Sequence, residues 1–336
     1  METAIQRKST DELFEMVRNF QDASISPASR RAYRSDWQTF IHFCDFRAVD
    51  ALPATGETIS LFLTELADLK KSVSTIVRSL TSINKAHELA GFGSVRTPQI
   101  KALMKGIKRT IGRPVDKVKG ITYKEILQMA AACDSSLLGV RDRAILMLGW
   151  TSALRRSELV ALNIGDLDIS ERGIILTVAR SKTDQDGEGK KIAIPRARKK
   201  TTCPVLCVER WLARLSEDDR APDKPLFSSV GTAGQRFWSN VVYGRLSDRM
   251  ISYTVKRYAH LCGFPPEKYA SHSLRRGLAT EAGSRRIPER IIARHTRHLS
   301  IAVLREYIES GNIWDENPLT GIYPTSSSDL ITHFDE

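Results

Sequence analysis

The sequence predicts a mainly α-helical protein of two domains, with a small antiparallel β-sheet in the second domain. Three observations lead to this fold class. Most apolar residues recur at helical spacing, one segment has the pattern of a β-hairpin, and a stretch containing Gly, Pro and Lys interrupts the periodicity after the first third. The length of 336 residues is comfortable for two domains.

The first third of the chain has the pattern of amphipathic helices. The predicted helices begin near residues 9, 27, 73 and 98. Ser9 with Glu12 forms a capping box at the first of them, and Ser26 before Pro27 is typical of the start of the second. Gly91 is a predicted end of the third. These signals indicate a helical first domain.

The segment "GRPVDKVKGIT" breaks the helical pattern and predicts a linker at about residues 112–121. Thr122 and Glu125 then form a capping box that starts a new helix. We therefore place the domain boundary near residue 118. The expected domains are residues 1–118 and residues 122–336.

The second domain combines helices with one predicted hairpin. In "GIILTVARSKTDQDGEGKKIAIP", two β-rich runs flank a polar turn that contains Gly. Further helices are predicted at residues 204–215, 248–263, 272–283, 288–298 and 300–310. The domain is therefore expected to be helical around a small antiparallel sheet.

The charge balance favours a polyanionic partner, and nucleic acid comes first. The chain has 51 Lys and Arg against 39 Asp and Glu, a net charge of +12. Residues 1–120 and residues 121–336 each carry +6, so neither part is a basic tail. On the helix near residue 98, a basic stripe lies apart from the apolar one and is a candidate DNA-phosphate contact: Lys101, Lys105, Lys108 and Arg109. A plain solvated face would show the same pattern.

Other classes of protein are disfavoured by the composition. The five cysteines lack paired zinc-ligand spacing, no apolar run approaches 18 residues, and the polar N-terminus has no secretory pattern. A cytoplasmic protein with reduced cysteines, and no membrane, is expected. No acidic cluster suits Mg²⁺ and no Walker-type glycine loop is present, so neither a metal nor another cofactor is expected.

Six residues carry a common chemistry. They are Arg155, Lys182, His272, Arg275, His298 and Tyr307, with Glu158 beside the first arginine. Two arginine forks suit a phosphodiester whose negative charge grows during transfer. A phenol has an ordinary pKa of about 10 and is a poor nucleophile at pH 7, and a histidine can help to remove or share its proton. Lys182 could give a proton to the departing sugar oxygen.

In order and spacing, these residues resemble the tyrosine recombinases, the phage integrase family. That family has Arg, Lys, His-x-x-Arg, His or Trp, and then Tyr. Here 90 residues separate Lys182 from His272, 23 separate Arg275 from His298, and 9 separate His298 from Tyr307. "MKGIKR" and "NPLTGIY" are similar to segments of the Cre-like members. Two positions depart from the family pattern, because Ala153 and Arg297 stand where Gly is usual.

The resemblance implies a C-shaped DNA clamp made of a SAM-like core-binding domain and a catalytic domain. A homotetramer would join two sites with inverted repeats, through a 3′-phosphotyrosine on Tyr307 and a Holliday junction. Arg155 and Arg275 would bind the scissile phosphate, with Lys182 as general acid and His272 as general base. His298 would donate a hydrogen bond to the phosphate, and Glu158 would orient the network. The segment after Tyr307 would dock on a neighbouring protomer.

Alternatives stay open at this level. Lys190 or Lys191 could replace Lys182, and His295 could replace His298. Tyr323 is the nearest rival to Tyr307. No arm-type DNA-binding domain is expected before residue 10, which suits a simple recombinase. A non-catalytic DNA-binding relative, or a topoisomerase-like enzyme that relaxes DNA, would carry much of the same pattern.

Overall fold

The computed structural model describes residues 26–113, 117–178, 189–230, 244–298 and 300–312. The chain divides into two compact units, Met1–Val115 and Asp116–Glu336, close to the boundary predicted near residue 118. Each unit has a hydrophobic core of its own. None of the helices described here is both long and apolar enough to cross a membrane. The helix predicted near residue 9 lies outside the described residues.

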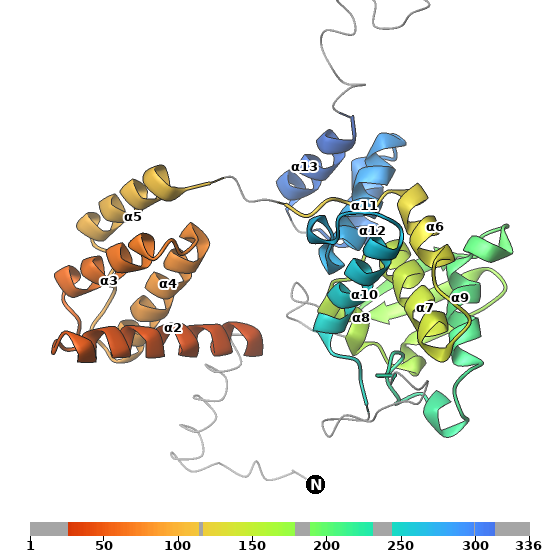
Figure 1. The fold of residues 1–336 in the computed structure, drawn as a ribbon, viewed down its shortest axis with the longest axis horizontal. Helices are drawn as coiled ribbons and strands as arrows, with labels where there is room; N and C mark the ends of the chain where they lie inside the picture. The colour runs from red at the N-terminus through yellow and green to blue at the C-terminus, as the bar shows by residue number, and fades with distance from the viewer. Residues whose placement is uncertain (1–25, 114–116, 179–188, 231–243, 299, 313–336) are drawn as a thin grey trace, which may run out of the picture. The chain divides into compact units, whose positions relative to one another are not determined.

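The described part of the first unit is helical (Figure 1). Its helices are α2 (Pro27–Phe46), α3 (Gly56–Asp68), α4 (Val73–Leu89) and α5 (Pro98–Ile111). Ser26 caps α2 as predicted, because its hydroxyl accepts a hydrogen bond from the backbone N–H of Ser29 at 3.2 Å. Phe40 of α2 and Phe62 of α3 are buried in the core, with ring centroids 5.0 Å apart. Helix α3 lies outside the segments that were predicted to be helical.

Helix α5 separates its apolar and basic faces as predicted. Ile100 and Ile107 are buried in the core of the first unit. The four basic side chains of the stripe are all exposed: Lys101, Lys105, Lys108 and Arg109. The basic face of α5 is therefore exposed on the first unit.

The second unit packs its helices around a buried central helix. In chain order they are α6 (Tyr123–Ala131), α7 (Leu137–Ser152), α8 (Arg156–Ala161), α9 (Pro204–Leu212), α10 (Asp248–Leu261), α11 (Ser271–Ser284), α12 (Glu289–Thr296) and α13 (Ile301–Asn312). The predicted capping box of Thr122 and Glu125 opens α6. Helix α7 is buried on several faces, with Ile145, Leu148 and Trp150 all in the core.

Among the described residues, the sheet of the second unit has three antiparallel strands in the order β1-β2-β3. They are β1 (Leu167–Ile169), β2 (Gly173–Val178) and β3 (Lys190–Pro195). The predicted hairpin is confirmed by the β2–β3 pair, in which Leu176 lies opposite Ile192 and both are buried. Strand β1 adds a third strand that the periodicity did not reveal, since it is only three residues long.

The last part of the predicted linker belongs to the second unit. The N–H of Ile121 donates to the carbonyl of Ser273 at 3.0 Å, and the Ile121 side chain is fully buried. A Cβ at Gly277 of α11 would lie 2.0 Å from the Ile121 carbonyl oxygen, so only glycine allows this approach. The segment before α6 is therefore fixed against α11, the helix that carries His272 and Arg275.

Candidate active site

Helix α13 places Tyr307 in a small apolar cluster with Ala279 of α11 and Leu304 of its own helix. The tyrosine is only 7% exposed. Its hydroxyl lies 3.0 Å from Nε2 of His272, in the first turn of α11. The structure therefore brings together a phenol and an imidazole that are 35 residues apart in the sequence.

His272 has the electrostatics of a proton acceptor. Burial lowers its pKa from the ordinary value, and the charges of Arg275, Arg276 and Arg155 lower the pKa further. The imidazole is therefore neutral at pH 7, and with its proton on Nδ1 it presents a free Nε2 to the phenol. This arrangement allows the Tyr307 proton to pass to His272.

Arg275, one turn further along α11 than His272, is almost fully buried, at 2% exposed. Its Nη1 donates to the carbonyl oxygen of Ala153 at 2.7 Å, while its buried Nη2 has no hydrogen-bond partner among the described residues. Burial, followed by the charges of Arg155 and Arg297, lowers its pKa to about 10. A guanidinium with an unused buried N–H is suited to receive an anionic oxygen.

Arg155 lies at the N-cap of α8, just before the helix begins, and Glu158 lies in its first turn. The Glu158 carboxylate accepts hydrogen bonds from the Arg155 backbone N–H at 2.9 Å and from its Nη1 at 2.7 Å. The Glu158 carboxylate thus holds both the backbone at the start of α8 and the arginine fork. The carboxylate is 3% exposed, and the arginine side chain is 27% exposed.

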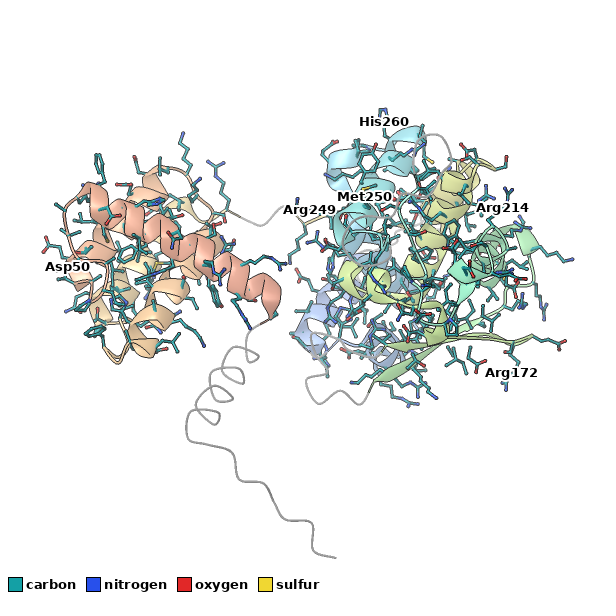
Figure 2. The ribbon with its side chains drawn as sticks, turned by 90° about the horizontal axis from the view of Figure 1, so that it is seen from below. Asp50, Arg172, Arg214, Arg249, Met250 and His260 are labelled. Atoms are coloured by element: carbon teal, nitrogen blue, oxygen red, sulfur yellow. The ribbon has the colours of Figure 1, made fainter. Side chains whose placement is uncertain are left out.

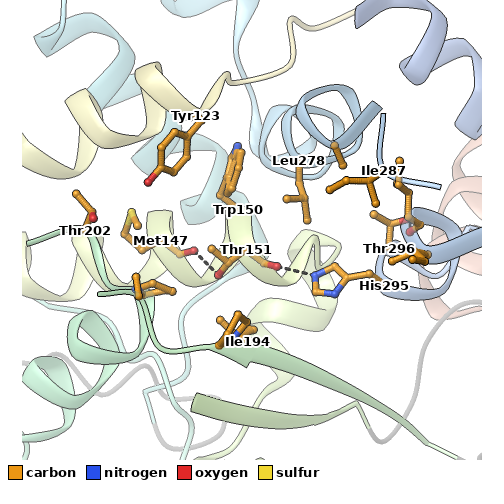
Figure 3. A pocket seen from close by; sticks show the side chains of 16 residues that line it. Tyr123, Met147, Trp150, Thr151, Ile194, Thr202, Leu278, Ile287, His295 and Thr296 are labelled. Atoms are coloured by element: carbon orange, nitrogen blue, oxygen red, sulfur yellow. Dashed lines mark hydrogen bonds between the residues drawn. The ribbon is translucent and has the colours of Figure 1, made fainter. Parts of the chain in front are cut away.

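His298 follows a left-handed turn at the end of α12 and faces Tyr307, with ring centroids 5.7 Å apart. Its Nδ1 lies 2.6 Å from the Thr296 hydroxyl. Burial and then the charges of Arg275 and Arg155 lower the His298 pKa to about 4. His295, the alternative, is directed elsewhere: its Nε2 lies 2.7 Å from the Thr151 carbonyl, on the wall of a separate pocket (Figure 3).

Some of the predicted site residues, and some of the alternatives to them, are not among the side chains gathered around Tyr307. Lys182 lies outside the described residues, as does Tyr323. Lys190 and Lys191 are exposed on β3. Among the described residues, no group of three or more His, Cys, Asp or Glu could hold a metal ion.

Two arginines of the site were not predicted. The Arg276 guanidinium lies 5.3 Å from the centroid of the Tyr307 ring and donates to the Val118 carbonyl at 3.0 Å. Arg297 donates from Nη2 to Glu158 at 2.8 Å, and both side chains are 3% exposed. The sequence contains one indication that Arg297 is unusual: it stands at a position where the family usually has Gly.

Fold and site together define a class of protein: a helical two-unit protein that holds a phenol against a neutral histidine, beside a cluster of arginines. The chain belongs to the phage integrase family, the tyrosine recombinases, since the model of the "Phage integrase family" matches residues 119–312. The resemblance deduced from the motif is thereby confirmed.

Comparisons with individual proteins agree with the family. The chain is 36% identical over 299 residues to an integrase/recombinase XerD homolog of Selenomonas ruminantium, covering 87% of this chain and 84% of that protein. It is 27% identical to a tyrosine recombinase XerC of Thermodesulfovibrio yellowstonii, covering 82% and 84%. The fold is similar to a Tn1549 transposon integrase solved with transposon right end DNA, with a TM-score of 0.60 at 14% identity, covering 87% of this chain and 92% of that one.

Proposed function

We propose that this protein is a site-specific DNA recombinase that cuts and rejoins strands through a 3′-phosphotyrosine. The observation that carries the proposal is the hydrogen bond between Tyr307 and the neutral His272, beside the unused N–H of Arg275. Tyr307 attacks the phosphorus while His272 takes its proton. The bond from phosphorus to the 5′ oxygen breaks, and Lys182 gives that oxygen a proton. Arg155 and Arg275 hold the phosphate oxygens, and His298 donates a further hydrogen bond to them.

The phosphotyrosine conserves the energy of the broken phosphodiester bond. The strands can therefore be rejoined without another source of energy. The freed 5′-hydroxyl attacks the phosphotyrosine of a partner strand, which releases the tyrosine and forms a Holliday junction. A second round of the same steps resolves the junction. A homotetramer on two inverted-repeat sites supplies the four tyrosines, as in Cre-like recombinases, and the reaction uses neither ATP nor a metal. We place this activity in the cytoplasm, on the nucleoid.

We propose that DNA lies against both units, which close on it as a clamp, with residues 1–118 as the core-binding domain. The net charge of +12 and the exposed basic face of α5 support this proposal. A lambda integrase dimer solved on a core site has a similar fold, with a TM-score of 0.57 at 19% identity, covering 90% of this chain and 95% of that one.

The decisive experiment incubates the protein with a library of supercoiled DNA carrying paired candidate sites. The mixture is denatured, protein-linked DNA is recovered and sequenced from its ends, and the linked residue is mapped by peptide mass. A 3′-phosphate on Tyr307 at a reproducible site supports the proposal. Recombinant joints distinguish a recombinase from a relaxing enzyme, which would yield relaxed circles only. Binding with no covalent product would indicate a non-catalytic DNA-binding protein.

The basic stripe of α5 gives a quantitative prediction. Replacing Lys101, Lys105 and Lys108 together with Gln should weaken DNA binding at all sequences, because phosphate contacts carry no base information. The slope of log affinity against log salt should become shallower by about 0.9 for each phosphate that the variant no longer neutralises. A triple replacement with Arg is the matched control and should keep the slope. An unchanged slope in the Gln variant would exclude this face from the DNA interface.

The lowered pKa of His272 predicts how the rate of adduct formation depends on pH. At subsaturating DNA, the second-order rate of adduct formation reports ionisation in the free protein. Because the His272 pKa is lowered, the neutral form persists below the ordinary value of 6.5, and the rate should begin to fall only at a more acidic pH. His272→Gln should remove this acid limb. His260→Gln, at an exposed position on α10 (Figure 2), should retain it. A limb centred at or above 6.5 would contradict the role of His272.

We also propose that residues 313–336 dock on a neighbouring protomer. An apolar pocket of about 370 Å³ in the second unit would receive them (Figure 3). Its wall includes Trp150 of α7 and Leu278 of α11, and Ile287 and Ile291 leave apolar surface exposed at its rim. The segment itself carries the apolar residues that such a pocket needs, including "IW" at its start and "DLITHF" near its end.

A further inference from the structure

Arg297 occupies a backbone conformation that rarely suits an arginine. Its φ of 57° and ψ of 44° are in the left-handed region, which is unfavourable for a residue with a side chain. Glycine would adopt the same conformation without that cost. The side chain is nevertheless buried, at 3% exposed, rather than directed into solvent. A strained, buried arginine points to a contribution from the side chain itself.

That side chain joins two parts of the active site. Its Nη2 donates to Oε2 of Glu158 at 2.8 Å, and Oε1 of the same carboxylate accepts from Arg155 at 2.7 Å. Glu158 therefore bridges the start of α8 and the turn after α12, across 139 residues of sequence. The next residue along that turn is His298, which faces Tyr307. The bridge ties the position of His298 to that of Arg155.

The charges around Glu158 also indicate that the Arg297 side chain contributes to the site. Beside Glu158 alone, the charge of Arg155 would be largely neutralised, which weakens its attraction for a phosphate. With Arg297 on the second carboxylate oxygen, the charges of Arg155, Arg275 and Arg297 exceed that of Glu158 by two. This excess suits a phosphodiester that gains negative charge as the tyrosine attacks.

We propose that Arg297 is a positioning residue of the phosphate site, which holds Glu158 against Arg155, fixes the turn before His298 and keeps the cluster positively charged. The inference rests on the proposed function. Arg297 acts through its neighbours, since its Nη2 donates to Glu158 and its Nη1 to the carbonyl oxygen of His295.

The test is Arg297→Gly, because glycine fits the left-handed backbone and the variant is expected to fold. Single-turnover adduct formation is measured with saturating duplex DNA. This DNA carries the site recovered as protein-linked DNA in the library experiment described above. The rate should fall about 10- to 100-fold, the effect expected of residues coupled in one ion-pair network, while DNA affinity changes little. A rate within twofold of the wild type would overturn the proposal.

Arg286→Gly is a matched control. Arg286 is also a left-handed arginine, with a φ of 56°, but it is exposed after α11. Its replacement should leave the rate unchanged. Arg297→Lys keeps the charge and loses the fork, so its rate should lie between those of the wild type and Arg297→Gly. This variant also keeps the proposal testable if Arg297→Gly is poorly folded, since a Lys variant at the wild-type rate would show that the fork is dispensable.

A double variant separates charge balance from a purely structural effect. In the Arg297→Gly background, Glu158→Gln removes the carboxylate that opposes Arg155, and adduct formation should recover several-fold. The same Glu158→Gln change in the wild-type background should slow it. Equal slowing in both backgrounds would overturn the charge-balance part of the proposal, because independent effects add.

A measurement on the protein without DNA tests the role of Arg297 independently of the proposed recombinase activity. Arg297 is one of the charges that lower the His298 pKa, which is about 4. In Arg297→Gly, the NMR titration midpoint of His298 should therefore rise, with the signal assigned by its loss in His298→Gln. If the wild type forms no adduct but the midpoint rises, the proposed function fails and the placement of Arg297 stands. If the adduct forms but the midpoint and rate are unchanged, Arg297 has no positioning role.

Discussion

Tyr307→Phe is expected to abolish covalent attachment of the protein to DNA while leaving site binding intact. The substitution removes only the hydroxyl, and the ring keeps its place in the apolar cluster between α11 and α13. Loss of the nucleophile should lower the cleavage rate by about 10⁶-fold, the scale found when a covalent nucleophile is removed. Adduct formation is followed on denaturing gels with labelled DNA, and binding by a native shift assay.

The control is Tyr253→Phe, since this tyrosine is 61% exposed on α10 and remote in sequence from the motif. It should form the adduct at the wild-type rate. An adduct that persists in Tyr307→Phe would show that another residue is the nucleophile. Peptide mapping of the linked DNA would then identify it.

Arg275→Lys is expected to give the second largest loss, with cleavage slowed about 10³-fold or more, as when an arginine that stabilises phosphoryl transfer is removed. Lysine keeps a positive charge, but it cannot both donate to the Ala153 carbonyl and present a second N–H in the same plane. The effect should appear in the single-turnover rate at saturating DNA.

Protein stability must be measured in parallel, because Arg275 is buried. Loss of a hydrogen bond to the Ala153 carbonyl would cost about 1–3 kcal/mol, which thermal unfolding would reveal. Arg285→Lys is the control, since that arginine pairs with Glu281 on the surface and such pairs contribute little. A cleavage rate for Arg275→Lys near that of Arg285→Lys would remove Arg275 from the catalytic set.

Helical periodicity predicted the elements that have one apolar face. Helix α5 is the clearest example, because its buried isoleucines and exposed lysines alternate at the spacing of a helix. Helix α7 was not predicted, since it lies in the core and is apolar on several faces, which removes the periodic signal. Strand β1 was missed because three residues are too few to show alternation.

The sequence by itself determined the chemical groups of the site and their order, because residue types and spacings are properties of the chain. The tyrosine, both histidines and two arginines that it singled out lie close together in the structure. The sequence left His295 and His298 as alternatives, and only the tertiary structure, through the left-handed turn at Arg297, directs His298 toward the phenol.

Tertiary structure also decided which residues complete the site. Arg155 and Arg297 are far apart in the chain and meet only through the buried carboxylate of Glu158. In the sequence, Ala153 and Arg297 were only departures from a glycine pattern. In the structure both have positive φ, one presenting its carbonyl to Arg275 and the other its side chain to Glu158. Such contacts depend on how helices pack, which local periodicity does not encode.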